Sequence, residues 1–102
     1  MARVSFDYDG VLSTRDGKIK AMAQMKLGNE VWIITRRQME NSEAVYSTAK
    51  ELGIKREHVV FTNGKAKWQF MERFNIDVHF DNNPNVVKEI NEKTKTKSIL
   101  FT

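Results

Sequence analysis

The chain has 102 residues, which is enough for one compact core and too few for a second domain with an apolar core of its own. Apolar residues make up 40% and charged residues 29%, a balance that excludes a disordered chain, and the net charge of +4 favours anionic partners in general. Because there is no cysteine, disulfides, thiolate metal sites and a cysteine nucleophile are excluded, and any metal must be held by oxygen or imidazole.

Short apolar runs rich in β-branched and aromatic residues predict strands at residues 4–6, 31–34, 59–61, 78–80 and 99–101. Helical patterns separate these runs. Strict alternation of strands and helices predicts a parallel sheet with right-handed crossovers. We therefore expect an α/β fold: a three-layer, Rossmann-like domain with a five-stranded parallel sheet in the order 3-2-1-4-5 and helices on both faces.

The first predicted helix follows the first strand. Its apolar residues Ile19, Met22 and Met25 recur at three-residue intervals, and Gly28 stands just beyond them. This spacing predicts an amphipathic helix that packs these three side chains inward and ends at a left-handed glycine cap.

Three further helices are predicted along the rest of the chain. One covers residues 42–52 and stops at Gly53, and another is signalled by the apolar spacing within residues 68–74. The last begins with Asn83 as N-cap and Pro84 at the first helical position. These signals complete the alternation that the sheet prediction requires.

No segment of the sequence predicts a membrane association. The longest apolar run, residues 31–34, is far shorter than the roughly 20 residues that a spanning helix needs. The first residues also lack the apolar segment of a signal peptide. We expect a cytoplasmic protein without a membrane partner.

Polar side chains are predicted to gather at one edge of this sheet. Asp7 and Asp9 follow the first strand, Thr35 the second and Asp81 the fourth, and Lys67 precedes the third helix. Ligands of open α/β sheets bind at the carboxyl ends of the strands. Clustered carboxylates need a compensating cation, and hard oxygen ligands point to Mg²⁺.

These residues carry a resemblance to a known superfamily. Residues 4–12, VSFDYDGVL, resemble the first motif of the haloacid dehalogenase superfamily, and residues 31–35, VWIIT, resemble the second. Lys67 resembles the lysine of the third motif, and residues 80–84, FDNNP, resemble the acidic fourth. The motifs occur in the family's order, so the chain is identified as a small, phosphatase-like member.

The resemblance implies a Mg²⁺-dependent phosphohydrolase. Asp7 would be the nucleophile that forms an aspartyl-phosphate, and Asp9 the general acid and base. Thr35 and Lys67 would bind the phosphoryl group and stabilise its charge during transfer. Asp7, Asp81 and the main-chain carbonyl of Asp9 would hold the metal.

Two features leave alternatives open. Asn82 stands where many relatives have a second acid, which makes a catalytically weak or inactive binding or regulatory module the rival interpretation. Lys65 also precedes the third helix, so it competes with Lys67 for the catalytic role. A phosphoacceptor receiver domain is disfavoured, because residues 62–64 after the third strand read TNG and contain no acid.

Other polar residues near these motifs are less informative. Arg36 and Arg37 follow the second motif and suit bidentate binding of a substrate phosphate or carboxylate, but a solvated surface explains them equally well. We assign Arg36 to substrate binding. His58 and His79 have no partner at a recognisable spacing, and we interpret them as structural or exposed.

The interval between the first two motifs holds only a short loop and a helix, which leaves no room for a cap domain. We therefore predict a single capless domain over residues 1–102, with the loop at residues 13–17 as its only flap. An open site suits a large substrate unless a second subunit of a homo-oligomer covers it. The basic charge favours a nucleotide or polynucleotide phosphate, such as a nucleic-acid end.

Overall fold

The computed structural model describes residues 1–102 and contains one five-stranded parallel sheet in the order β3-β2-β1-β4-β5. Its strands are β1 (Arg3–Phe6), β2 (Glu30–Thr35), β3 (Val59–Phe61), β4 (Val78–Asp81) and β5 (Lys97–Leu100). The helices are α1 (Arg15–Lys26), α2 (Glu43–Leu52), α3 (Trp68–Met71) and α4 (Pro84–Lys93). The predicted fold class and strand order are confirmed.

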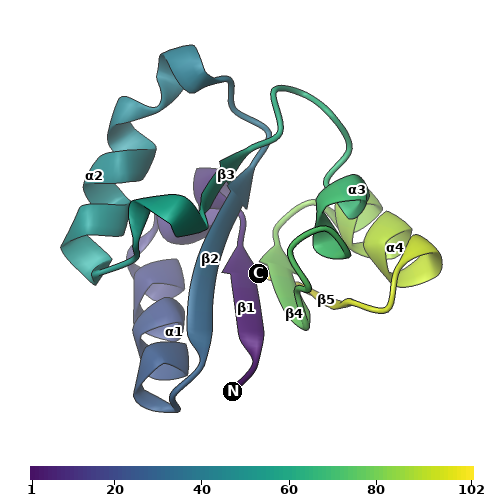
Figure 1. The fold of residues 1–102 in the computed structure, drawn as a ribbon, viewed down its shortest axis with the longest axis horizontal. Coiled ribbons are helices and arrows are strands. Elements are labelled where there is room, and N and C mark those ends of the chain that lie inside the picture. The colour runs from purple at the N-terminus through teal and green to yellow at the C-terminus, as the bar shows by residue number, and fades with distance from the viewer.

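Helices cover both faces of the sheet, which makes three layers (Figure 1). Helices α1 and α2 lie on one face, over a core that includes Val4, Phe6 and Ile33. Helices α3 and α4 lie on the other, over a smaller core that includes Trp32 and Ile34. Because β2 is buried on both faces, its run of apolar residues shows no alternation.

The helix α1 was predicted correctly, but its buried face was not. Ile19 and Met22 are 48% and 42% exposed, and only Met25 of the three packs partly against the core. The buried residues are instead Gly17 and Ala21, one turn apart. Small side chains face inward here because α1 lies so close to the preceding turn that a Cβ atom on Gly17 would meet the carbonyl oxygen of Val11 at 1.8 Å.

Two other expectations need correction. The segment at residues 13–17 is not a flap, because Arg15 already begins α1 and the Thr14 side chain caps that helix by accepting from Gly17 N. Helix α3 is only a single turn, since the chain leaves the helix after Met71. The caps of α4 at Asn83 and of α2 at Gly53 are as predicted.

None of the helices combines the length and the apolar composition that crossing a bilayer requires.

Candidate active site

The site begins at the carboxyl end of β1, where the chain turns sharply. Asp7 is largely buried, and its Oδ1 accepts a hydrogen bond from Tyr8 N at 2.8 Å. Its own backbone N–H donates to Phe80 O at 2.9 Å, which extends the pairing of β1 with β4. Gly10 follows with φ of 80°, a conformation that other residues rarely adopt. This turn fixes Asp7 at the edge of the sheet.

Lys67 joins the ends of two neighbouring strands. Its Nζ lies 2.8 Å from Asp7 Oδ1 and 2.6 Å from Asp81 Oδ2. Asp81 is the last residue of β4, which pairs directly with β1. All three side chains are largely withdrawn from solvent, so the ammonium group compensates two carboxylates where water does little to screen them. Lys65, the competing candidate, is exposed.

A buried polar chain continues from Asp81 into the protein. Asp81 Oδ2 lies 2.9 Å from His79 Nε2, and His79 Nδ1 lies 2.7 Å from Ser5 Oγ. These contacts fit a neutral imidazole that donates from Nε2 to the carboxylate and accepts the serine hydroxyl at Nδ1. His79 therefore fixes the position of the Asp81 carboxylate from the buried side.

The sequence interpretation missed the part that Ser5 and His79 play here. The signal was the period of two along each strand, which puts Ser5 on the same face as Asp7 and His79 on the same face as Asp81. Ser5 and His79 are also direct partners in the register of β1 and β4. Without the register, the two polar residues could not be paired.

The electrostatics of the cluster follow from burial and from Lys67. Burial raises the pKa of Asp7, against the opposing attraction of Lys67. Burial alone would also raise the pKa of Asp81, but the hydrogen bond from His79 and the charge of Lys67 outweigh it and lower this pKa to about 2. Burial lowers the pKa of His79, because a charged imidazolium is disfavoured where no water reaches it.

Asp9 takes no part in this chain of contacts and pairs with an arginine. Arg37 Nε lies 3.0 Å from Asp9 Oδ2, and Arg37 Nη2 lies 2.9 Å from Asp9 Oδ1. Thr35, which lies two residues before Arg37, is fully buried, and its Oγ1 accepts a hydrogen bond from Arg37 N at 3.2 Å. The side chain of Arg36 donates to Gly64 O at 3.0 Å.

A small cavity of about 280 Å³ brings most of the predicted site residues together. Thr35 does not line it, because the threonine lies fully buried behind the strand end. The lining residues are Asp7, Asp9, Arg36, Lys67, Asp81, Asn82, Asn83 and Val86.

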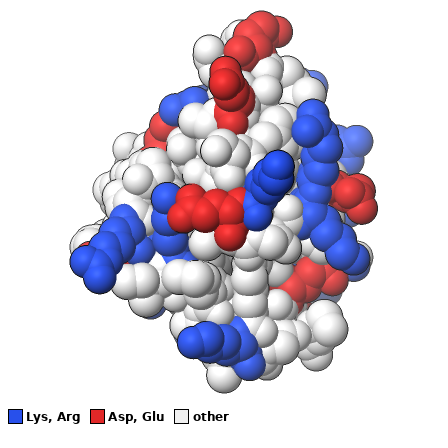
Figure 2. Space-filling model, turned by 90° about the vertical axis from the view of Figure 1, so that its left-hand side faces the viewer, with Lys and Arg blue, Asp and Glu red and all other residues white.

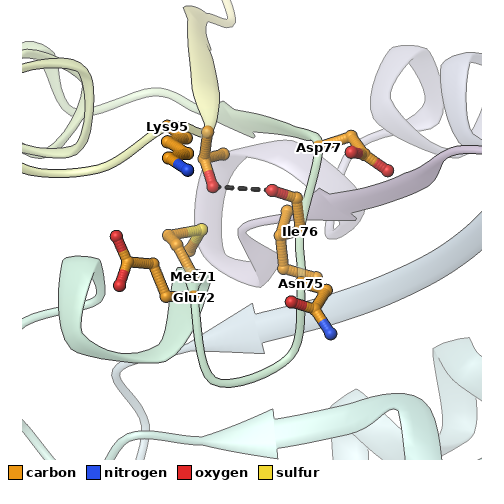
Figure 3. Close-up of a pocket in the computed structure, with 7 residues that line it drawn as sticks. Met71, Glu72, Asn75, Ile76, Asp77 and Lys95 are labelled. Carbon is orange, nitrogen blue, oxygen red and sulfur yellow. Dashed lines mark hydrogen bonds between the residues drawn. The ribbon is translucent and has the colours of Figure 1, made fainter.

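A larger cavity of about 440 Å³ lies at the opposite edge of the sheet (Figure 3). Its lining residues Asp77 and Lys95 stand before β4 and β5, and Thr96 Oγ1 donates to Ile76 O across it at 2.7 Å. Asp77 Oδ2 is itself taken by Arg3 N. The smaller cavity brings three aspartates and a buried lysine together, and we place the chemistry there.

Comparison with known proteins identifies the family of the chain. The family model of the 5'-nucleotidases matches residues 17–102. The chain belongs to the 5'-nucleotidase family. This membership confirms the resemblance to hydrolases of the haloacid dehalogenase type. The matched residues include Thr35, Lys67 and Asp81, but the match begins after Asp7 and Asp9.

A solved structure supplies the fold independently of the family match. A Vibrio cholerae protein described as a 3-deoxy-D-manno-octulosonate 8-phosphate phosphatase superposes with a TM-score of 0.60 at 20% identity. The match covers 95% of this chain and 64% of that one, so the chain spans less than two thirds of its length. At this identity the likeness establishes the fold. No curated protein matches the chain by sequence.

A divalent metal is expected of a 5'-nucleotidase family member of this type. No group of three or more histidine, cysteine, aspartate or glutamate side chains is placed to hold one. However, the expected set is two carboxylates and a main-chain carbonyl. Asp7 Oδ2 has no hydrogen-bond partner, and Asp81 Oδ1 accepts only from Asn83 N. Two largely buried carboxylates whose oxygens keep lone pairs available for coordination fit a hard cation such as Mg²⁺.

Proposed function

We propose that this protein is a phosphomonoesterase that uses Asp7 as its nucleophile. The observation that supports this best is the position of Lys67, whose Nζ contacts both Asp7 and Asp81. An ammonium at this point opposes the rise in the pKa of Asp7 that burial causes, and it compensates the charge of the oxygens of a phosphoryl group that meets Asp7. The same placement is what phosphoryl transfer requires, since catalysis there is mostly positioning and charge stabilisation.

The reaction we propose has two steps. An oxygen of Asp7 bonds to phosphorus while the bond to the leaving-group oxygen breaks, and Asp9 gives that oxygen a proton. In the second step Asp9 takes a proton from water, whose oxygen bonds to phosphorus as the bond to Asp7 breaks. The products are an alcohol and inorganic phosphate, and both aspartates return to their starting states.

The phosphoryl group would be held by residues that follow β2. Arg36 lines the cavity beside Asp7 and offers a guanidinium to the phosphoryl oxygens. Thr35 is assigned the same role, but its hydroxyl is fully buried and reaches a phosphate only after a local rearrangement. Arg36 is therefore the stronger of the two assignments.

The cofactor we propose is Mg²⁺, held by Asp7, Asp81 and the main-chain carbonyl of Asp9. When bound, the ion neutralises carboxylate and phosphoryl charge. Asn82 contributes no charge to this set, but its amide lies against Gly10, where a Cβ atom would meet Asn82 Nδ2 at 2.1 Å. Asn82 thus helps to fix the turn after the nucleophile.

A nucleoside monophosphate is the substrate class we favour, because the matching family is described as 5'-nucleotidase. A polynucleotide end is less well supported. Figure 2 shows acidic side chains between and beside the basic ones on the face that α1 and α2 cover. We further propose that the protein is cytoplasmic and that its site works without a cap domain. If the protein forms a homo-oligomer, a second subunit would cover the site.

The test is hydrolysis of p-nitrophenyl phosphate and nucleoside 5'-monophosphates with and without Mg²⁺. Turnover should need the metal, and Asp7→Asn should abolish it. Asp16→Asn is the matched control, because Asp16 is an exposed carboxylate in the first turn of α1. Full activity in Asp7→Asn would contradict the nucleophile assignment.

The second candidate is a catalytically inactive binding module, favoured by Asn82 in place of an acid. It predicts that the folded wild-type protein binds Mg²⁺ and phosphate by calorimetry without any turnover. An aspartyl-phosphate at Asp7 that survives for hours would favour a phosphoacceptor role instead.

A further inference from the structure

The guanidinium of Arg37 occupies the whole carboxylate of Asp9. One N–H group contacts each oxygen, at 3.0 Å from Nε to Oδ2 and at 2.9 Å from Nη2 to Oδ1. The remaining nitrogen, Nη1, donates to Asn41 O at 3.0 Å, and the Tyr8 ring lies 5.0 Å from Arg37 Cζ. Hydrogen bonds from three nitrogens and the Tyr8 ring on one side therefore position the guanidinium.

This pairing conflicts with the work proposed for Asp9. A general acid must carry a proton on one carboxylate oxygen, but here both oxygens face N–H donors. In the paired conformation Arg37 engages both oxygens of Asp9, so at least one of these contacts must open before Asp9 can exchange a proton with the leaving group or with water.

The pair is placed so that it opens readily. The side chains of Asp9 and Arg37 are 58% and 31% exposed, and exposed pairs contribute little to stability. Arg37 also has other carboxylates nearby, because it lines a neighbouring cavity of about 460 Å³ together with Glu40 and Glu43. Asp9 lines the cavity of Asp7. The pair thus links a residue that lines one cavity to a residue that lines the other.

We propose that Arg37 is a latch on Asp9, and that the latch is released by phosphomonoesters whose leaving group carries a second anionic group. The phosphoryl group occupies the cavity of Asp7, and the second anion takes the guanidinium fork in place of Asp9. The inference rests on the proposed function, in which Asp9 is the acid, and it adds that a nucleotide with a second phosphate is a better substrate than a nucleoside monophosphate, whose leaving group is neutral. Arg37 is a positioning residue for Asp9 and does not touch the reacting atoms.

The test compares 2-hydroxyethyl phosphate with phosphoglycolate, which has a carboxylate in place of the hydroxymethyl group. Wild-type kcat should be higher for phosphoglycolate, by about fivefold for an exposed pair. Arg37→Gln should raise kcat on 2-hydroxyethyl phosphate by a similar factor and raise KM for phosphoglycolate, so that the preference disappears. Arg15→Gln, which removes an exposed charge at the start of α1, should keep the wild-type preference.

A different result identifies a supporting role. If Arg37→Gln lowers kcat equally on both compounds and Arg37→Lys restores it, Arg37 holds Asp9 in its working position and the latch is wrong. An inactive wild-type protein would contradict the proposed function. The latch would then be tested by a second measurement that does not depend on turnover.

That measurement is the ¹⁵N–¹H signal of Arg37 Nε in Asp7→Asn, which we expect to bind both compounds without turnover. Phosphoglycolate should move the signal, and 2-hydroxyethyl phosphate at the same concentration should not. Equal shifts with both compounds, or no shift with either, would overturn the latch whatever the activity of the wild type.

Discussion

Lys67 Nζ lies 2.6 Å from Asp81 Oδ2, and only 2% and 1% of these two side chains is exposed. The same ammonium reaches Asp7. Two neighbouring strands therefore end in carboxylates that one cation holds together. Because a single positive charge faces two negative ones, the cluster keeps a net negative charge, which suits a divalent ion in the same cavity.

Replacing Lys67 by methionine removes the charge and keeps most of the volume of the side chain. We expect kcat to fall by about 10²–10³-fold, because phosphoryl charge loses its stabilising cation. The free energy of unfolding should also fall by about 3–5 kcal/mol, since two buried carboxylates lose their partner. Steady-state kinetics and urea unfolding measure the two effects.

Lys65→Met is the matched control, because Lys65 is exposed two residues earlier. It should change stability by less than about 0.5 kcal/mol and leave kcat unaltered. A loss of activity in Lys65→Met with a normal Lys67→Met would reverse the assignment of the catalytic lysine.

The burial of His79 predicts a dependence of stability on pH. The unfolded imidazole takes up a proton near its ordinary pKa of 6.5, whereas the folded one has a lowered pKa and stays neutral. The unfolded state therefore binds more protons below that pH, and the free energy of unfolding should decrease on acidification from about pH 7 to 5, by at most about 1.4 kcal/mol per pH unit.

His79→Gln removes this group and should flatten the decrease, although it lowers stability at neutral pH by leaving Asp81 and Ser5 without their ring partner. Urea unfolding at three pH values measures the slope. An unchanged slope in His79→Gln would show that the pH dependence comes from another group.

The sequence predicted the fold because local signals and the sheet architecture agreed. Apolar runs marked the strands, and polar residues at their carboxyl ends marked Asp7, Asp9 and Asp81 as a group. Caps such as Gly53 and Asn83 require only local geometry, so they were predictable.

The missing parts depend on tertiary contacts. No periodic pattern in the sequence gives the strand register that pairs Ser5 with His79. Nor does any such pattern show that the turn before α3 buries Lys67 and exposes Lys65. The bidentate pairing of Arg37 with Asp9 likewise joins two loops that only the folded sheet brings together.

Substitutions on α1 test which of its faces is buried, the one that the sequence predicted or the one that the structure shows. Met22→Gln should change the free energy of unfolding by less than about 0.5 kcal/mol, because Met22 is exposed. Ala21→Leu should cost about 1–3 kcal/mol, since Ala21 is fully buried and a larger side chain overpacks the core. If Met22→Gln proves the more damaging change, the helix is rotated relative to this structure.

Gly17 couples α1 to the turn that carries Asp9. Alanine has a helix propensity about 1 kcal/mol better than glycine, so local structure alone predicts that Gly17→Ala stabilises α1. The new Cβ atom would however lie 1.8 Å from Val11 O and 2.4 Å from Val11 C, and backbone atoms cannot move aside as a flexible side chain does. We expect a net loss of about 1–3 kcal/mol on urea unfolding.

The displaced backbone is that of the turn Tyr8–Leu12, so kcat should fall as well. Gly53→Ala is the control, because no atom lies within 4 Å of the Cβ added at Gly53, whose φ of 78° makes alanine unfavourable without any contact. That variant should lose about 1 kcal/mol from backbone strain and keep its kcat. Equal loss of activity in both variants would mean that general destabilisation, and not the contact with Val11, disturbs the site.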